Sequence, residues 1–293
     1  MDIRFYHTGY CTHPECMVER GGSLRKAAFP AMTAHITHQG GNLLFDTGYA
    51  PRFFQACRRF PEKFYALTTP VTLSQPTIRE RLGDAAHDIN QIFLSHLHAD
   101  HCTDIVGMQV YRRWIPGGPL DRIPVYSPQD GLARTRQIGG DPQEETYAGE
   151  FDFHTIGPGD VVEVGPMLVE AFEAEHTVPA VGLRIMGPSE SDPRAEAAFA
   201  YTGDTDLCDT EVEMARGVDL LLSECAFEDG RDTVRGVHMV GSRAGELASR
   251  AGVGRLLLTH LQPWTDPETV RRAAEGVFDG PVRCVKPGEA YRV

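Results

Sequence analysis

The sequence predicts an α/β fold in which helices lie outside β-sheets. Short apolar runs rich in Val, Ile, Leu and Phe, which are typical of strands, alternate along the chain with longer amphipathic segments, which are typical of helices. No internal repeat and no low-complexity linker divides the chain. We therefore expect a single domain over residues 1–293.

Length and composition are those of a globular protein. The chain has 293 residues, with 41% hydrophobic and 24% charged side chains, and no apolar run approaches the roughly 20 residues that a membrane span needs. The N-terminal segment MDIRFYHTGY lacks the pattern of a signal peptide, and the seven cysteines are scattered rather than arranged as a disulfide framework. We expect a soluble, cytoplasmic protein.

The net charge of -13 bears on the partners. An acidic protein repels polyanions, and binding to a nucleic acid backbone usually relies on clustered Lys and Arg. We expect a small-molecule substrate and no membrane contact, and long nucleic acids are disfavoured. A homodimer is compatible with the sequence.

The N-terminal half begins with a predicted strand at residues 1–10. Two further segments are expected to be helices because each carries a proline near its start, 51–60 and 76–82. Apolar runs predict strands at 32–38, 42–48, 91–96 and 123–127, and amphipathic patterns predict helices at 104–114 and 128–138.

The C-terminal half alternates in the same way. Strands are predicted at 161–164, 167–176, 180–186, 198–204, 218–224, 255–260, 282–285 and 289–293, and helices at 240–252 and 267–276. Gly- and Pro-rich breaks at 139–145 and 187–197 predict surface loops.

Four potential metal ligands lie close together in the segment LSHLHADHC. His96, His98, Asp100 and His101 fall within six positions, directly after the apolar run QIFL. Imidazole and carboxylate groups suit zinc and similar divalent ions. His96 and His98 can point the same way on extended backbone, whereas Asp100 and His101 need a turn to reach a common point. The sequence therefore predicts a metal site, and the geometry suggests two ions; the alternative is a polar loop rich in His.

Four later strands also end in a residue that can bind metal or move protons. These residues are His176, Asp204, Glu224 and His260. Loops at the ends of a sheet are where a rigid scaffold gathers functional groups from distant parts of a chain. We expect one site assembled from several strand ends.

The motif HLHADH, with the downstream His, the Asp of GDT and the final TH, resembles the metallo-β-lactamase-fold hydrolase superfamily. The resemblance covers most of the chain and implies a four-layer αββα sandwich. It implies two divalent ions, zinc or else manganese or iron. The first would be held by His96, His98 and His176, and the second by Asp100, His101 and His260, with Asp204 as the bridge.

The C-terminal half is similar to the ribonuclease Z branch of that superfamily. The similarity lies in VDLLLSECAFEDG, VHMVGSRAGELASRAGV and RLLLTHLQPW. It implies that Glu224 and His238 form a proton-transfer pair near the leaving group. Chemistry also favours such a pair, because phosphodiester cleavage expels an alkoxide that a histidine oriented by a carboxylate can protonate. Alternatively, His238 is a polar surface residue before a helix.

Two features depart from ribonuclease Z. Its long tRNA-binding arm is absent here, since only 27 residues separate His176 from Asp204. The N-terminal stretch FPAMTAHITHQGGNLLFDTGYAPRF is more similar to lactonase-type members. A phosphodiesterase acting on a small phosphodiester is the leading interpretation, and a lactonase or carboxylic ester hydrolase is the alternative.

The expected mechanism is metal-assisted hydrolysis. Two ions would activate a water that Asp100 and Asp204 anchor, and His238 paired with Glu224 would protonate the departing oxygen. Two other classes are less favoured. A di-iron redox protein generally has glutamate at the position of His98, and a metal-stabilised binding protein would need no proton-transfer pair.

Smaller motifs are assigned structural roles. Cys11, His13 and Cys16 lack a second ligand pair with zinc-finger spacing, so free thiols are expected. Cys102 is expected to be a buried thiol. The helix predicted at 51–60 is interpreted as a packing helix, with a lid over the site as the alternative.

Overall fold

The computed structural model describes residues 1–14, 24–49, 70–73, 78–189, 192 and 194–293. The chain divides into two compact units that interleave along the sequence. Unit 1 comprises Met1–Phe5, Ala34–Leu43 and Thr155–Val293, and unit 2 comprises Tyr6–Thr33 and Leu44–His154. The single domain over residues 1–293 stays a prediction.

The first sheet has eight strands in the order β15-β1-β2-β3-β5-β6-β7, and β4 pairs with β1. The register of β5 with β6 is parallel, with Ile92 opposite Val125. Its strands are β1 (Asp2–Pro14), β2 (Lys26–His38), β3 (Gly41–Phe45), β4 (Val71–Leu73), β5 (Gln91–Phe93), β6 (Ile123–Ser127), β7 (Phe151–Thr155) and β15 (Ala290–Arg292).

Helices of unit 2 pack around a core that β5 and β6 supply. Ile92 and Val125 from the strands are fully buried beside Ile105, Val106 and Met108 from α7. Fully burying such a side chain contributes about 1.5 to 3 kcal/mol, so this cluster anchors the loop that follows β5. The helices are α4 (Ile78–Leu82), α5 (Ala85–Asp88), α6 (Ala99–Cys102), α7 (Ile105–Trp114) and α8 (Gly131–Gly139).

The second sheet lies within unit 1 and has seven strands in the order β14-β13-β12-β11-β10-β9-β8. Strands β8 to β11 pair antiparallel, whereas β11, β12, β13 and β14 are parallel. The carboxyl ends of β11, β12 and β13 therefore share one edge. The strands are β8 (Val161–Val164), β9 (Met167–Glu173), β10 (Val181–Pro188), β11 (Glu196–Tyr201), β12 (Leu220–Glu224), β13 (Leu256–Thr259) and β14 (Val282–Cys284).

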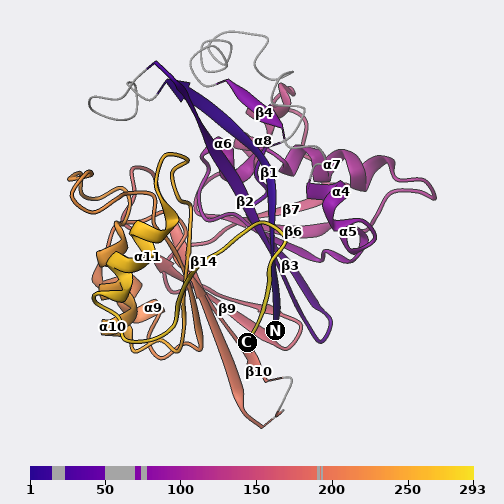
Figure 1. Ribbon diagram of the computed structural model, residues 1–293. Helices are drawn as coiled ribbons and strands as arrows, with labels where there is room; N and C mark the ends of the chain where they lie inside the picture. The colour runs from indigo at the N-terminus through magenta and orange to yellow at the C-terminus, as the bar shows by residue number, and fades with distance from the viewer. Residues whose placement is uncertain (15–23, 50–69, 74–77, 190–191, 193) are drawn as a thin grey trace. The chain divides into compact units, whose positions relative to one another are not determined.

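Three helices cover one face of this sheet (Figure 1). They are α9 (Asp209–Met214), α10 (Gly241–Ala251) and α11 (Pro267–Glu275). Two glycines let α10 and α11 approach closely, because a Cβ at Gly241 would lie 2.5 Å from the Val270 carbonyl oxygen and one at Gly245 would lie 2.5 Å from that of Ala274. The contact fixes the start of α10, which follows His238.

Most of the elements predicted from periodicity are present. The differences fall on short pieces: α5, α6, α9, β4 and β7 had no predicted counterpart, and several strands end two or three residues earlier than expected. Residues 140–145 lie between α8 and β7, as predicted for a loop, whereas both ends of the loop predicted at 187–197 belong to β10 and β11. The helix predicted at 51–60 lies outside the described residues. Within the described ranges, no helix combines the length and apolar character needed to cross a bilayer.

Glu211 on α9 is a fully buried acid in unit 1. Its carboxyl oxygens make no hydrogen bond to any residue that the structure describes. Burial raises its pKa well above the usual value, and the nearby Cys208 and Glu224 add to the effect. The folded protein therefore holds this carboxyl neutral through a pH range in which the unfolded chain ionises it.

Replacing Glu211 by Met is expected to stabilise the protein at pH 8 by about 1 to 3 kcal/mol, because Met needs no hydrogen bond and cannot ionise. An acid whose pKa is raised in the folded state does not lower the free energy of unfolding at a pH below its unfolded pKa, and lowers it increasingly as the pH rises above that value. The gain from Glu211→Met should therefore shrink towards pH 4. Urea unfolding at both pH values measures it. The control is Glu213→Met on the exposed face of α9. A gain independent of pH would contradict the neutral-acid interpretation.

Candidate metal and proton-transfer site

The loop after β5 carries the histidine cluster of unit 2. His96 follows the strand and is fully buried, and His98 has extended backbone at the start of α6. The single turn of α6 then carries Asp100 and His101. The turn that these two residues need is therefore supplied by α6.

The cluster has distances suited to a metal ion. Nε2 of His96 and Nδ1 of His98 lie 2.9 Å apart, and the rings of His96 and His101 have centroids 4.1 Å apart. Two nitrogens that bind one tetrahedral ion at about 2.0 to 2.1 Å are separated by roughly 3.3 Å, so His96 and His98 fit a shared ion. Asp100 lies beside the cluster, with a carboxylate oxygen 3.5 Å from His101 Nε2.

Asp46 orients this cluster from the end of β3, and it was not among the predicted site residues. Its buried carboxylate lies 2.8 Å from His101 Nδ1 and accepts hydrogen bonds from the backbone N–H and hydroxyl of Ser95. A carboxylate only accepts, so His101 donates from Nδ1 and keeps its lone pair on Nε2. This is the carboxylate–histidine arrangement that supports metal ligands.

Ser95 extends the same network to His96. Its hydroxyl donates its single hydrogen to Asp46 and lies 3.1 Å from His96 Nδ1, which can therefore donate to it. The lone pair of His96 then sits on Nε2, the nitrogen that faces His98. Burial raises the pKa of Asp46, while the contacts with His101 and Ser95 lower it.

Replacing Asp46 by Asn is expected to weaken metal binding by about 10- to 100-fold, because the amide can present a donor to His101 and disturb its tautomer. Competition with a chromophoric chelator measures the affinity. The side chain of Asp84, the residue before α5, makes no capping hydrogen bond to that helix, so Asp84→Asn is the matched control. Unchanged affinity in the Asp46 variant would show that this carboxylate does not support a ligand.

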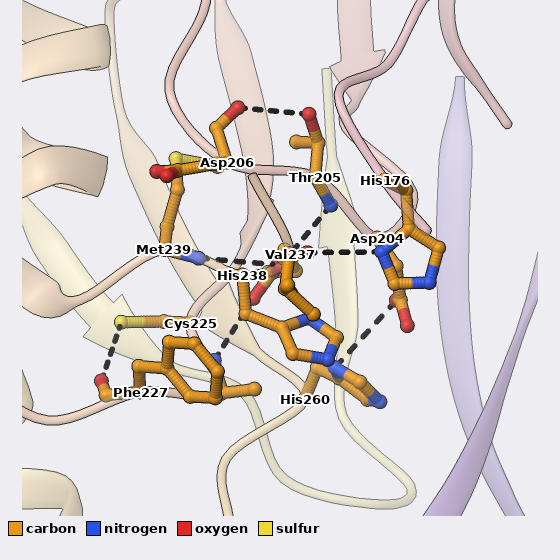
Figure 2. Close-up of polar contacts among 12 residues, drawn as sticks. His176, Asp204, Thr205, Asp206, Cys225, Phe227, Val237, His238, Met239 and His260 are labelled. Atoms are coloured by element: carbon orange, nitrogen blue, oxygen red, sulfur yellow. Dashed lines mark hydrogen bonds and ion pairs between the residues drawn. The ribbon is translucent and has the colours of Figure 1, made fainter. Parts of the chain in front are cut away.

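The second group of residues lies in unit 1, where three parallel strands end. Asp204 follows β11, Glu224 is the last residue of β12, and His260 follows β13. Figure 2 shows Asp204 beside His260, with a carboxylate oxygen 3.5 Å from His260 Nδ1. His238 joins them, since Asp204, His238 and His260 place potential ligand atoms within 4.8 Å of one another. Their donor types also fit a divalent ion.

His238 and Glu224 form a close pair. Nδ1 of His238 lies 2.8 Å from Oε1 of Glu224, which is fully buried. Since the carboxylate only accepts, Nδ1 carries the hydrogen and Nε2 is the nitrogen that can exchange a proton. Backbone N–H groups of Thr205, Ala226 and Met239 donate to the same carboxylate and fix its position.

His176 has a ring held by a backbone carbonyl. Its Nδ1 donates to the Val237 carbonyl oxygen over 2.9 Å, which leaves the lone pair on Nε2 (Figure 2). Burial lowers the pKa of His176, and the charge of Asp204 partly opposes that effect. A neutral imidazole with a fixed tautomer is the form that binds a metal.

Asp46 and His260 share a strained backbone conformation directly after a strand. Their φ angles are 56° and 60°, in the left-handed region that residues other than glycine rarely adopt. Such strain costs about 1 to 3 kcal/mol each and is commonly found at functional sites. In both cases the conformation turns the side chain at the strand end.

The predicted site residues thus fall into two groups. Unit 2 brings together His96, His98, Asp100 and His101, and unit 1 brings together His176, Asp204, Glu224, His238 and His260. The division of the ligands between two ions stays a prediction. Asp46 could have been found from sequence, since it directly follows the strand NLLF, and Asp204 likewise comes soon after the strand AFAY.

The cysteines considered earlier are structural or lie outside the described part. Cys102 is buried, and burial raises its pKa to about 11, as expected for an unreactive thiol. Cys11 is also buried, with a pKa of about 11 for the same reason. His13 and Cys16 belong to the same possible metal-binding motif as Cys11, and Cys16 lies outside the described residues.

Comparison with known proteins identifies the family. A family model described as a beta-lactamase superfamily domain matches residues 42–261. The uncharacterized protein Rv1339 of Mycobacterium tuberculosis is 38% identical over 209 residues, which cover 69% of this chain and 72% of that protein. Ribonuclease Z of Methanopyrus kandleri is 30% identical over 225 residues, which cover 67% of this chain and 76% of that enzyme.

A solved structure shows the same fold. The metallo-beta-lactamase fold protein YhfI from Bacillus subtilis superposes with a TM-score of 0.67 at 24% sequence identity, covering 88% of this chain and 90% of that one. Mixed sheets with helices, described above, agree with the predicted α/β sandwich. The chain therefore belongs to the β-lactamase superfamily, has the metallo-β-lactamase fold, and is a metallo-hydrolase related to ribonuclease Z.

Proposed function

We propose that this metallo-hydrolase is a binuclear phosphodiesterase that cleaves a small phosphodiester. The observation that carries the proposal is the pair of His238 and Glu224, 2.8 Å apart, beside Asp204 and His260. A buried carboxylate that fixes the Nδ1 tautomer of an imidazole is the arrangement needed to protonate a poor leaving group. A carboxylate can also orient a metal ligand in this way, so the tests below separate proton transfer from metal binding.

The proposed ligand assignment is the one implied by the family. The first ion is assigned to His96, His98 and His176, the second to Asp100, His101 and His260, and the bridge to Asp204. The Asp46 carboxylate that orients His101 and the Val237 carbonyl that orients His176 support it, since both rings keep the lone pair on Nε2. When bound, divalent ions would lower the pKa of water to near neutrality and offset charge on the phosphate; zinc is favoured over manganese or iron.

The protein side chains divide the remaining work. Asp100 and Asp204 are proposed to accept hydrogen bonds from the attacking water and hold its orientation. His238 is proposed to give the proton on Nε2 to the departing alkoxide, while Glu224 stabilises the positive charge that the ring carries beforehand. After the leaving group departs, the ring is neutral, and its Nδ1–H still donates to Glu224. Its Nε2 can then take up another proton.

Charge supports a small substrate. A net charge of -13 opposes a long polyanion but tolerates one phosphodiester, whose single charge is easily offset by metal ions. The relationship to ribonuclease Z supports phosphodiester chemistry, and the short chain between His176 and Asp204 disfavours tRNA. The protein is proposed to act in the cytoplasm on a small molecule, without contact with a membrane. A homodimer is compatible with this role.

A substrate screen tests the proposal. Protein reconstituted with zinc, manganese or iron is assayed with bis(p-nitrophenyl) phosphate, an alkyl phosphodiester, an acyl-homoserine lactone and a carboxylic ester. We expect turnover of the phosphodiesters. Efficient lactone opening without phosphodiesterase activity under any metal would replace the proposal by the lactonase alternative that the N-terminal half suggested.

A further inference from the structure

The segment 235–239, which carries His238, is fastened at successive backbone positions. The N–H of Gly236 donates to Asp206 over 2.8 Å, and the carbonyl of Val237 accepts from His176 over 2.9 Å. The N–H of Met239 donates to Glu224 over 3.3 Å, and its carbonyl accepts from the N–H of Phe227 over 3.0 Å. The carbonyl of His238 itself is a further acceptor in this segment.

Arg243 makes that last contact and a second one. From the first turn of α10, its NH2 group donates to the His238 carbonyl oxygen over 3.0 Å, and its NH1 group donates to Asp206 over 3.2 Å. The Arg243 side chain is only 11% exposed and that of Asp206 only 1%. One largely buried guanidinium therefore links the backbone of His238 to a carboxylate two residues after Asp204.

Asp206 is itself fixed to the sheet. Its backbone N–H donates to the Glu175 carbonyl oxygen over 2.9 Å, and its side chain also accepts from the backbone N–H of Leu207. Asp206 thus joins the strand ends that carry Asp204 and His176, and Arg243 extends this connection to His238. A planar guanidinium can make the two contacts simultaneously, which a lysine ammonium on its flexible stem does less precisely.

We propose that Arg243 is a positioning residue that holds His238 at a fixed place relative to Asp204 and His176. It acts through the His238 backbone and through Asp206. The inference rests on the proposed function in one respect, since His238 is taken as the proton donor. Its structural content, that Arg243 holds the segment 235–239, is independent of that role.

Two neighbouring arginines provide matched controls. Arg235 also donates to Asp206, over 2.6 Å, but its side chain is 63% exposed and this hydrogen bond does not involve the His238 carbonyl. Arg250 lies on the same helix as Arg243 and pairs with Asp209 and Glu246. Arg235→Met tests loss of charge beside Asp206, and Arg250→Met tests loss of an arginine from α10.

The experiment compares Arg243→Met and Arg243→Lys with these controls in full-length, metal-loaded protein. Arg243→Met is expected to retain its metals and to accelerate amide exchange in 235–239. Its rate on an alkyl phosphodiester should fall about 10-fold or more, and its rate on bis(p-nitrophenyl) phosphate less than about threefold, because only the first leaving group needs a well-placed acid. Lys should restore part of the loss, Arg235→Met should show a smaller loss, and Arg250→Met should match the wild type.

Two results would overturn the inference. Amide exchange in 235–239 equal to that of the wild type would show that Arg243 does not hold the segment. The second result is that His238→Ala changes the ratio of the rates on the alkyl phosphodiester and on bis(p-nitrophenyl) phosphate, whereas Arg243→Met leaves this ratio unchanged. It would show that holding the segment does not affect proton donation by His238. Failure of the proposed function is recognised differently: His238→Ala then loses equally on both substrates, whereas faster exchange in Arg243→Met still identifies the positioning contact.

Discussion

His238→Ala is expected to lose about 10²- to 10⁴-fold in rate on alkyl phosphodiesters and far less on p-nitrophenyl phosphodiesters. An alkoxide is a poor leaving group and needs a proton as it departs, whereas p-nitrophenolate leaves without one. The ring is placed for this task by Glu224, which holds Nδ1 and leaves Nε2 to exchange the proton. Steady-state rates of one variant on the two substrates give the comparison.

Metal content is the essential control for this variant. His238 places a ring nitrogen within 4.8 Å of ligand atoms of Asp204 and His260, so it also has the geometry of a ligand. Loss of an ion would depress both substrates together, whereas loss of an acid would depress only the alkyl one. Equal losses on both substrates would remove His238 from the acid role.

Asp204→Ala is expected to lose both ions and to lower the rate about 10³-fold or more on every substrate, since binuclear catalysis contributes several kcal/mol. Asp204 is 3% exposed and is the assigned bridge. Elemental analysis after reconstitution with excess zinc or manganese measures the equivalents bound. The wild type should hold two, and a wild type that never holds more than one equivalent would refute the binuclear proposal.

His260→Ala provides the comparison for Asp204. His260 is assigned to the second ion alone, so its removal should release mainly one equivalent and leave the other. The two residues face each other across 3.5 Å, which makes general damage to the strand ends similar in the two variants. Equal loss of both ions in each variant would undermine the division of ligands.

The fold was largely predictable because many of its strands are unbroken apolar runs with clear ends. Leu220, Leu221 and Leu222 are almost completely buried in a parallel sheet, and such strands appear in sequence as unbroken apolar segments. Short elements were missed for a physical reason. The single turn α6 has only four residues, too few for a helical period to show, and its shape depends on hydrogen bonds to Asp46 and its neighbours.

The residues of the candidate site were easier to predict from the sequence than the residues that hold them in place. Ligand types and positions near strand ends predicted His96, His98 and Asp204 as ligands, and each belongs to a group of side chains that could hold a metal ion, while their roles as ligands stay predictions. Asp206 and Arg243 could not be found this way, because their importance lies in what they contact. A buried carboxylate and an arginine 37 positions later in the chain give no local pattern.

The carboxylate of Glu224 has a consequence for the isosteric substitution commonly used to remove a charge. Its Oε1 accepts from His238, from the Thr205 N–H and from the Met239 N–H, and its Oε2 accepts from the Ala226 N–H. A glutamine in this position has one acceptor oxygen, which would remain where three donors meet, so its NH2 group would oppose the Ala226 N–H. Glu224→Gln should therefore preserve the imidazole tautomer yet lower the free energy of unfolding by about 1 to 3 kcal/mol, the cost of an unsatisfied buried donor. Glu224→Gln replaces one carboxylate oxygen, which accepts a hydrogen bond, by an NH2 group, which can only donate. The two side chains have nearly the same shape but different hydrogen-bonding capacity.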